Sequence, residues 1–535
     1  MPDGPWEDTM NTRRSTECLA AAFLALCAAI TVMYLIFGYG VYLDSDMASE
    51  LILADHLAGS FSPVSASWHY STEVLLLNTQ LIFAPLMALF GSSWQLVRTL
   101  GCIILLAVLA ASCIYAAVSF GSSRAHAFFF AGLNICVCSP LYAQNVIIGA
   151  YYIPHAVLGM LLWGGFARWQ RRSSPVKTVW LAALSAAMGF SSVRYLLSVI
   201  LPVACAALWQ YLFPVDARTR RDHLKAAFAA GLAAAGAAGY LLSCRLLPLL
   251  FHYNADHYAS MGYGDWNSFS LSDQLQSMLY GLLTLLGFET PTPLMGVQGI
   301  LNALILLMPA ACAVVLLRRS RDDAQTESVR LCRLSLVLGF ALSAVVFLLI
   351  RSVYLERYWL PLLMLGAPVM AACLTHEKDG ILRAAVIALL AGTVLLTSAS
   401  CIYYSAKNPQ VQTDMRMEAV DLIRRMGLDK GYATFWNANI ITELSDGEID
   451  VVSLIARTEQ DGSVSFHLNP WLETDEELSM DRPDAPIFLL LGTWERDGCD
   501  AFLQKTQAIH HELDGWIDLY EIPAQRLLFE AVGAL

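Results

Sequence analysis

The stretch Tyr42-Leu-Asp-Ser-Asp-Met-Ala-Ser-Glu50 follows directly on an apolar run of about 25 residues, long enough to cross a bilayer as a helix. Carboxylates are costly inside hydrocarbon, so we expect Asp44 and Asp46 to lie at the water interface just beyond this first membrane span. That placement makes both residues candidates for function. The alternative is that they only begin the next helix, with Asp46 as its N-cap and Glu50 in its first turn.

The composition is that of a membrane protein. The 535 residues are 57% hydrophobic and only 15% charged, and the mean hydropathy is +0.53. Apolar runs long enough to cross a bilayer recur from Cys18 to Tyr404 and then stop. We therefore expect a cytoplasmic N-terminus at 1–17, an all-α polytopic membrane module at 18–404, and a soluble extracytoplasmic domain at 405–535.

Charge and cysteine are unevenly distributed along the chain. The part from Ser405 onward has 24 acidic and 10 basic residues, so it accounts for the net charge of −12. The sequence has no basic patch or stripe of the kind that binds nucleic acid, so no nucleic-acid partner is expected. Of the 13 cysteines only Cys499 follows the last apolar run, which favours buried core cysteines over a disulfide framework.

The positions of basic residues predict the topology, because short loops rich in Lys and Arg lie on the cytoplasmic side. Arg13 and Arg14 precede the first span, which is too long for a cleavable signal, so we expect the N-terminus inside and loop 43–73 outside. That loop contains no Lys or Arg. The same rule predicts a second outer loop at 252–293 and places the tail outside.

About eleven net crossings follow from this topology. The apolar pieces 125–139 and 271–288 would bring the number of membrane segments to about 13, but we expect the first to be buried or re-entrant and the second to lie at the interface. The expected crossings are 18–42, 74–90, 99–119, 144–167, 178–191, 195–213, 226–250, 296–317, 334–352, 357–375 and 383–404.

The tail has the pattern of a small α/β domain. Short apolar stretches at 432–436, 449–455, 486–491 and 516–522 predict strands, and 414–426 and 437–444 predict helices. The acidic run Asp475-Glu-Glu477 is expected to be solvated surface.

Arginines gather at the predicted outer ends of the spans, where they could bind a phosphate on a lipid carrier. A guanidinium stays charged and can bind two phosphate oxygens at once. For any single arginine, the alternative is a side chain that only extends to the membrane interface. The candidates for phosphate binding are Arg194, Arg351, Arg357 and His69, and the further candidates for the site are Glu50, Tyr358 and His257.

A carboxylate that faces such a phosphate could act as a general base. It would take the proton of an acceptor hydroxyl as that hydroxyl attacks the anomeric carbon of a sugar. The arginines would stabilise the charge on the departing lipid phosphate. The sequence supplies the base in its first outer loop and the cations near the membrane surface.

Four short motifs connect the chain to a known family: Leu43-Asp-Ser-Asp46, Phe90-Gly91 followed by Arg98, Glu356-Arg-Tyr-Trp-Leu-Pro361 and Gly431-Tyr-Ala-Thr-Phe-Trp-Asn-Ala-Asn439. With the many spans and the soluble tail, they resemble the GT-C superfamily of polyprenyl-phosphate-sugar-dependent glycosyltransferases. Within it the chain resembles bacterial members akin to the protein O-mannosyltransferases and to the aminoarabinose transferases that modify lipid A.

The resemblance implies transfer of a sugar from a polyprenyl-phosphate donor, held at the lipid of the cell membrane, to an extracytoplasmic glycan, lipid or protein acceptor. It implies that the acidic residue just after the first span is the base or positions the acceptor. Here that residue is Asp44 in the first place and Asp46 in the second. Many members have Asp-Glu where this chain has Asp-Ser-Asp, so the choice between the two stays open.

The resemblance also bears on cofactors. Members that use a lipid monophosphate donor generally need no metal, whereas the oligosaccharyltransferases do. We expect no cofactor here, with a divalent metal as the alternative.

Two other classes of function fit a polytopic membrane protein: a transporter or lipid-linked sugar flippase, and a non-enzymatic assembly protein that binds through its tail. Transporters commonly contain paired repeats and interrupted helices around a midplane site. This sequence has no convincing internal repeat, and its polar residues gather at the outer ends of spans. The enzyme is therefore the favoured interpretation.

Overall fold

The computed structural model describes residues 5–60, 62–214, 220–254, 270–293, 295–318, 327–349, 354–407, 411–459, 462–513 and 515–534. The chain divides into two compact units. The first comprises Met1–Ile36, Ile103–Leu246 and Tyr258–Tyr404. The second comprises Phe37–Cys102, Leu247–His257 and Ser405–Leu535, so it combines the first loop with the tail.

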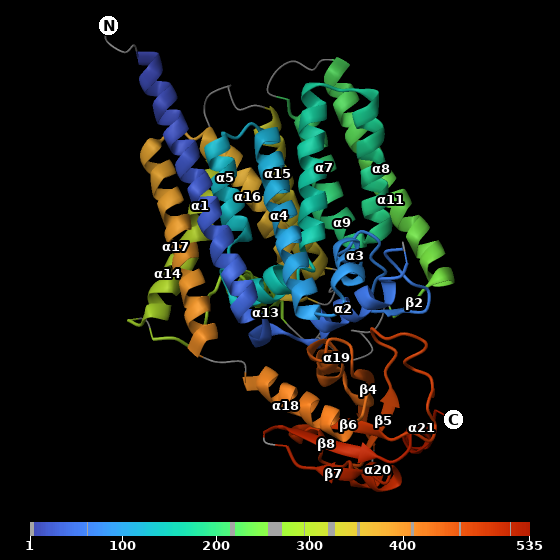
Figure 1. Cartoon of the computed structure of the whole chain (residues 1–535). Helices are drawn as coiled ribbons and strands as arrows, with labels where there is room; N and C mark the ends of the chain where they lie inside the picture. Colours follow the sequence, from blue (N-terminus) through green and yellow to red (C-terminus); the bar gives the residue numbers. More distant parts are fainter. Residues whose placement is uncertain are drawn as a thin grey trace. The chain divides into compact units, whose positions relative to one another are not determined.

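The first unit is built of helices (Figure 1), and four of its long helices, α1, α4, α11 and α17, extend into the second unit. The helices are α1 (Pro5–Tyr42), α4 (Trp94–Phe120), α5 (Arg124–Ile135), α6 (Pro140–Tyr142), the π-helix η1 (Ala143–Ile148), α7 (Ile153–Arg171), α8 (Pro175–Ser191), α9 (Val193–Tyr195), the π-helix η2 (Leu196–Ile200), α10 (Leu201–Leu212), α11 (Arg220–Leu250), α13 (Leu271–Thr284), α14 (Val297–Leu317), α15 (Glu327–Leu349), the 3-10 helix η4 (Glu356–Trp359), α16 (Leu360–Thr375) and α17 (Gly380–Lys407).

Within the described residues, eight helices are long and apolar enough to cross a membrane. They are Arg14–Tyr42, Trp94–Phe120, Val193–Leu212, Asp222–Leu250, Val297–Leu317, Glu327–Leu349, Glu356–Thr375 and Gly380–Lys407. A ninth is possible if Arg124–Ile135 and Pro140–Ile148, which meet at a bend of 92°, form one broken span. The chain is thus a multi-pass membrane protein. The eleven crossings expected from the sequence exceed this number because they also included shorter helices.

The expected crossing at 74–90 is wrong. In the structure it is the 11-residue helix α3 (Gln80–Phe90), which contains Pro85. Such a helix is about 16 Å long, roughly half the hydrocarbon thickness. One expected crossing is therefore lost. If the bent pair of helices that begins at Arg124 crosses the membrane, one crossing is gained, and Arg168 and Arg171 remain on the same side as the N-terminus.

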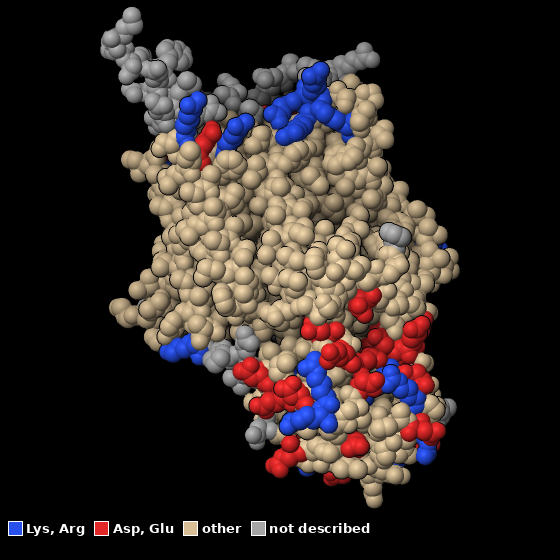
Figure 2. Space-filling view, in the orientation of Figure 1, with Lys and Arg blue, Asp and Glu red and all other residues tan. Residues whose placement is uncertain are grey.

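The surface of the helical unit has the charge pattern that a membrane span requires. In Figure 2 its middle carries almost only uncharged side chains, and Lys and Arg gather at one end. Acidic side chains are instead spread over the tail. A band without charge is what hydrocarbon tolerates, since a charged side chain at the bilayer centre is costly.

The tail forms the α/β domain that the sequence predicts, around a six-stranded sheet of order β5-β4-β3-β6-β8-β7. Strand β3 pairs in parallel with β4 and β6, and the other pairs are antiparallel. The sequence did not predict β5 and β7. The elements are α18 (Val411–Met426), β3 (Lys430–Thr434), α19 (Phe435–Leu444), β4 (Asp450–Thr458), β5 (Val464–Leu468), β6 (Ile487–Gly492), the 3-10 helix η5 (Thr493–Glu495), α20 (Asp500–Lys505), β7 (Ile509–His511), β8 (Ile517–Ile522) and α21 (Gln525–Val532).

Both faces of this sheet are covered, because alternate residues of a strand point to opposite faces. Tyr432 and Val452 pack in one core with residues of α20 and α21. Ala433 and Val451 pack in a second core with residues of α18 and α19. Two buried cores account for the near-continuous apolar character of the central strands.

The first loop contains α2 (Ser45–Leu57), β1 (His69–Tyr70) and α3 (Gln80–Phe90), and β1 pairs in parallel with β2 (His252–Tyr253). In the sequence, Met47, Leu51, Ala54 and Leu57 recur at helical spacing, a pattern that predicts an amphipathic helix on the outer membrane surface. The helix is present, but these four residues are buried, and α2 packs against both α3 and α19. Its apolar face therefore contacts protein instead of lipid.

Backbone hydrogen bonds join the first loop to the tail. The His69 amide donates to the Glu473 carbonyl at 2.8 Å, and the Leu472 amide donates to the His69 carbonyl at 2.9 Å. The Asp475 amide donates to the Ser67 carbonyl at 2.9 Å. The first loop and the tail consequently lie on the same side of the membrane. The acidic run 475–477 was expected to be solvated surface. This is only partly so, because the backbone of Asp475 is hydrogen-bonded to the first loop.

A buried ion pair fixes α4 to α19 within the second unit. The Arg98 guanidinium donates to both carboxylate oxygens of Glu443, at 2.7 and 2.6 Å, and the two side chains are 1% and 0% exposed. Arg98 also donates to the Met47 carbonyl at 2.7 Å, and the Tyr39 hydroxyl donates to Glu443 at 2.5 Å. The expected crossings 74–90 and 99–119 would place Arg98 in a loop on the cytoplasmic side, but in the structure it is paired with the tail.

Breaking this pair should destabilise the second unit. We expect Arg98→Met or Glu443→Gln to lower the free energy of unfolding by about 3–5 kcal/mol, since each change leaves a buried charged partner uncompensated. The measurement is thermal unfolding of the purified protein in lipid nanodiscs, followed by tryptophan fluorescence.

The exposed pair Arg424–Glu448 supplies the control. Arg424→Met should change stability by less than about 1 kcal/mol. The double variant Arg98→Met/Glu443→Leu should lose less unfolding free energy than the single variants Arg98→Met and Glu443→Leu lose together. Equal, small losses in all variants would contradict the importance of the buried pair.

Candidate functional site

Asp44 lies immediately after α1 and caps the next helix. Its Oδ1 accepts the Met47 amide at 2.8 Å, so Asp44 is the N-cap of α2. The capping alternative named Asp46 for this role, and that assignment is wrong. Asp46 lies instead in the first turn of α2, where a negative charge is favoured by the amide groups of the helix N-terminus.

Glu50 is hydrogen-bonded to residues at the start of α3. One of its carboxylate oxygens accepts hydrogen bonds from the hydroxyl of Thr79 and from Nε2 of Gln80, the latter at 3.0 Å. Burial raises the pKa of Glu50 above its ordinary value, although these hydrogen bonds and the Arg98 charge act in the opposite direction. Glu50 thus links α2 to α3 rather than facing solvent.

A buried arginine that the sequence did not single out interacts with Asp44. Arg416 of α18 is 6% exposed and has an attractive electrostatic interaction with Asp44. Burial lowers the pKa of Arg416 to about 10, so it remains charged at neutral pH. In the sequence Arg416 is one of several polar residues of a predicted helix, and no local signal marks it as buried.

In the first unit, the structure brings together Arg194, a predicted phosphate-binding residue, and Tyr358, a further candidate for the site. The guanidinium carbon of Arg194, on α9, lies 4.9 Å from the ring centre of Tyr358, on η4. Beside Arg194 in sequence, Tyr195 stacks on His155 with ring centres 4.3 Å apart. His155 is 3% exposed, and neither of its ring nitrogens has a hydrogen-bond partner in the part of the chain that the structure describes.

His155 is thus a polar side chain near this arginine that the sequence analysis missed. Nothing in the sequence around His155 indicates a site, because a single histidine in an apolar helix usually belongs to the core. The cluster of Arg194, Tyr358, Tyr195 and His155 offers a guanidinium and a histidine at one place. An anionic or hydroxyl-rich group could be bound by that combination.

The other predicted site residues have different outcomes. Arg357 is the neighbour of Tyr358 on η4. His69 has partners within the second unit: its Nε2 lies 2.7 Å from an oxygen of Asp475, and its ring stacks on His252 at 4.8 Å. Arg351 and His257 lie outside the described residues. The roles assigned to Arg194 and Arg357 remain predictions.

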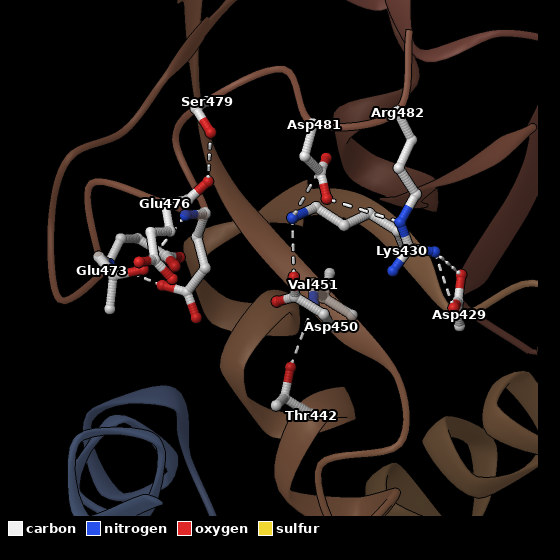
Figure 3. A network of polar contacts seen from close by, with 12 residues as sticks. Asp429, Lys430, Thr442, Asp450, Val451, Glu473, Glu476, Ser479, Asp481 and Arg482 are labelled. Atoms are coloured by element: carbon white, nitrogen blue, oxygen red, sulfur yellow. Dashed lines mark hydrogen bonds and ion pairs between the residues drawn. The ribbon is translucent and has the colours of Figure 1, made fainter. Parts of the chain in front are cut away.

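A second polar network of the tail begins at the amino ends of β3 and β4 (Figure 3). The Lys430 ammonium lies 2.8 Å from Asp450 and 3.8 Å from Asp481, and its side chain is 5% exposed. In the same view Arg482 binds Asp429 at 2.7 Å. These groups are largely paired with one another, so the network holds the domain together and is not a site.

Glu473 belongs to the same region and is almost fully buried. Its Oε1 accepts the Ser453 amide at 2.8 Å. Burial, followed by the nearby Glu477 charge, raises the pKa of Glu473 well above its ordinary value of about 4.3. The folded state therefore keeps a proton on Glu473 at pH values at which the unfolded chain has already released it.

This shift predicts a pH dependence of stability. The contribution of protonated Glu473 is fully present below about pH 4.3 and is lost as the pH rises toward the higher folded-state pKa. Glu473→Gln keeps the oxygen that accepts the Ser453 amide but does not titrate. We expect this variant to gain stability relative to the wild type as the pH rises above the unfolded-state pKa of about 4.3, measured as the midpoint of thermal unfolding.

The exposed neighbour Glu476 provides a matched control, since Glu476→Gln removes one acid without touching the buried carboxyl. Its unfolding midpoint should follow that of the wild type across the pH range. Parallel profiles for Glu473→Gln and the wild type would contradict the proposed protonation.

Within the described ranges, no group of three or more His, Cys, Asp and Glu side chains is arranged to hold a metal ion.

Comparison with known proteins gave matches only among solved structures. No family model and no curated protein sequence matches the chain. The structure is similar to the oligosaccharyltransferase of Archaeoglobus fulgidus in complex with Zn and sulfate, with 12% identity, 96% of this chain and 76% of that chain covered, and a TM-score of 0.48.

It is also similar to AglB of the same organism in complex with an inhibitory peptide and a dolichol-phosphate, with 10% identity, 96% and 77% coverage and a TM-score of 0.47. A third match is ArnT of Cupriavidus metallidurans in the apo state, with 12% identity, 94% and 97% coverage and a TM-score of 0.41. At this similarity no residue, substrate or reaction is transferred to the present chain.

Proposed function

We propose that the protein is an integral membrane glycosyltransferase that moves a sugar from a polyprenyl-phosphate donor to an extracytoplasmic acceptor. The observation that carries the proposal is the position of Asp44, just after the end of the first membrane helix and at the N-terminus of α2, where it interacts electrostatically with buried Arg416. A carboxylate at a membrane surface, held by a helix N-terminus, is suited to accept a proton from a hydroxyl group.

Asp44 is the general base in this mechanism. Its Oδ1 is held by the Met47 amide, which fixes the carboxylate at the start of α2. The positive end of the helix and the Arg416 guanidinium both favour a negative charge at this place. As the acceptor hydroxyl attacks the anomeric carbon, its proton passes to Asp44 and the bond between the sugar and the lipid phosphate breaks.

Arg194, Arg357 and Tyr358 are proposed to bind the donor phosphate. The ring of Tyr358 restricts the Arg194 guanidinium by a cation–π contact, so less side-chain freedom is lost when a phosphate binds. The positive charge would stabilise the lipid phosphate as it departs. Donor sugar, lipid length and acceptor class depend on the shape of the site and are left open in this proposal.

A flippase for lipid-linked sugars is the second candidate, because one observation favours it. The helices Arg124–Ile135 and Pro140–Ile148 meet at 92°, and interrupted helices are common in transporters. The two functions differ in chemistry: a flippase leaves the glycosyl phosphate bond intact, whereas a transferase releases polyprenyl phosphate.

Substitution of Asp44 by Asn separates catalysis from helix capping. Asn is as good an N-cap as Asp, so Asp44→Asn should keep the start of α2 and lose only the charge interaction with Arg416, and its unfolding midpoint is measured in parallel. Loss of the base should lower the turnover number by roughly 10²–10⁴-fold. The assay supplies purified protein in nanodiscs with polyprenyl-phosphate sugars and a mixture of envelope glycans, lipids and peptides, and it follows released polyprenyl phosphate.

Asp46→Asn is the matched control, and it should retain most of the activity. If Asp46→Asn is inactive and Asp44→Asn is active, the base is Asp46. Full activity in both variants would remove the two carboxylates from the mechanism. Transport of the donor across the membrane without release of polyprenyl phosphate would favour the flippase.

Removal of the Arg194 charge should weaken binding of the donor. We expect Arg194→Ala to raise the dissociation constant of undecaprenyl phosphate, used as a probe, by roughly tenfold or more, because a charge-assisted contact is lost. The control is Arg330→Ala on α15, which removes a half-buried arginine that donates to the Phe213 carbonyl. Equal effects of the two variants would show that only overall charge matters.

A further inference from the structure

The carboxyl ends of β3 and β6 form a topological switch point in the tail sheet. From β3 the chain continues to β4 and β5 on one side, whereas β6 pairs with β3 on the other side. In open α/β sheets, ligands bind outside the carboxyl ends of strands at such a point. Here those ends are Thr434 of β3 and Gly492 of β6.

Four aromatic side chains lie at these ends, and together we call them the aromatic edge: Phe435, Trp436, Trp494 and Trp516. Trp436 is 53% exposed and Trp494 is 62% exposed. Both are held by neighbouring rings, since Trp494 stacks on Trp516 at 4.9 Å and Trp436 meets Phe435 edge-on at 5.2 Å. Exposed indoles in fixed positions are suited to recognition, because little conformational entropy is lost on binding.

Buried hydrogen-bond donors lie next to these rings. The guanidinium carbon of Arg416 is 5.1 Å from the ring centre of Trp516, and Arg416 Nη2 donates to Asn437 Oδ1 at 3.3 Å. In the described part of the chain, Arg416 Nε and Asn437 Nδ2 have no hydrogen-bond partner. These side chains are 6% and 1% exposed. Leaving such donors unpaired is costly, so a ligand with acceptor oxygens would stabilise them.

Glu495 fixes the distance between the two strand ends. Its Oε1 accepts the Thr434 hydroxyl at 2.6 Å, and its Oε2 accepts the Gly492 amide at 2.7 Å. The Thr493 amide also donates to the Trp516 carbonyl at 2.8 Å. These hydrogen bonds hold the backbone of the aromatic edge in a fixed arrangement, so its side chains are not independent loop residues.

We propose that the aromatic edge, with Arg416 and Asn437, binds a saccharide that serves as the acceptor. The flat apolar face of a pyranose ring stacks on an indole, and its hydroxyl and ring oxygens accept from the unpaired donors. The inference rests on the proposed function for the role of the saccharide as acceptor. The favourable electrostatic interaction between Arg416 and Asp44 connects this surface with the proposed base.

Two features favour a neutral saccharide over other occupants. The tail has 24 acidic and 10 basic residues, which disfavours a polyanionic chain. Insertion of the two exposed tryptophans into lipid would leave the buried donors of Arg416 and Asn437 unpaired, because acyl chains offer no acceptors.

Binding is tested on the full-length protein in nanodiscs without any donor. The probes are the methyl glycosides of glucose, galactose, mannose and N-acetylglucosamine, measured by saturation-transfer NMR and by tryptophan fluorescence. We expect saturable binding of at least one glycoside, weakened about tenfold or more in Trp436→Ala and in Trp494→Ala. Trp180→Ala, which removes a tryptophan 46% exposed on α8, is the control and should leave binding unchanged.

Absence of binding by every glycoside, or equal affinity in the two edge variants and the wild type, overturns the inference. Quenching of Trp436 and Trp494 by brominated lipid would assign these rings to the membrane and overturn it as well. Glycoside binding without any sugar transfer would support the saccharide site and remove the proposed enzymatic function. Transfer with an unchanged acceptor KM in both edge variants would leave the function standing and remove the site.

Discussion

The buried ion pair between Arg98 and Glu443 is the interaction on which the second unit depends. Neither side chain reaches water, so its desolvation must be offset by the two hydrogen bonds of the pair and by Tyr39 and the Met47 carbonyl. The pair joins the start of a membrane helix to a helix of the soluble tail. Because Met47 belongs to α2, the same guanidinium also fixes the helix that Asp44 caps.

This arrangement explains how an acidic loop can be ordered at a membrane surface. The apolar face of α2 is covered by α3 and α19, and Glu50 is satisfied by Thr79 and Gln80. Residues 67–70 are hydrogen-bonded to 472–475 as a further connection. With the loop held on several sides, the carboxylate of Asp44 has a fixed position, which general-base chemistry requires. The proposed base thus depends on contacts made far from it in sequence.

The tail contributes more than support for the loop. Its two cores bury both faces of the sheet, and the switch point between β3 and β6 leaves an edge with exposed indoles and buried donors. Glu495 and Glu443 show two uses of a carboxylate in one domain: the first braces the strand ends, and the second binds the membrane helix α4. The same domain can therefore position the first loop and present a binding surface.

Sequence alone determined the membrane character, most of the long spans, the main strands of the tail and the candidacy of Asp44. These follow from local rules: hydrocarbon tolerates only long apolar helices, and strands show a short apolar pattern. Only the tertiary structure decided that α3 is too short to cross, that Asp44 rather than Asp46 is the N-cap, and that Arg98 and Arg416 are buried. Arg98 and Glu443 are 345 residues apart in the sequence, so no local sequence pattern indicates that they pair. Burial and charge pairing of this kind arise only when the chain has folded.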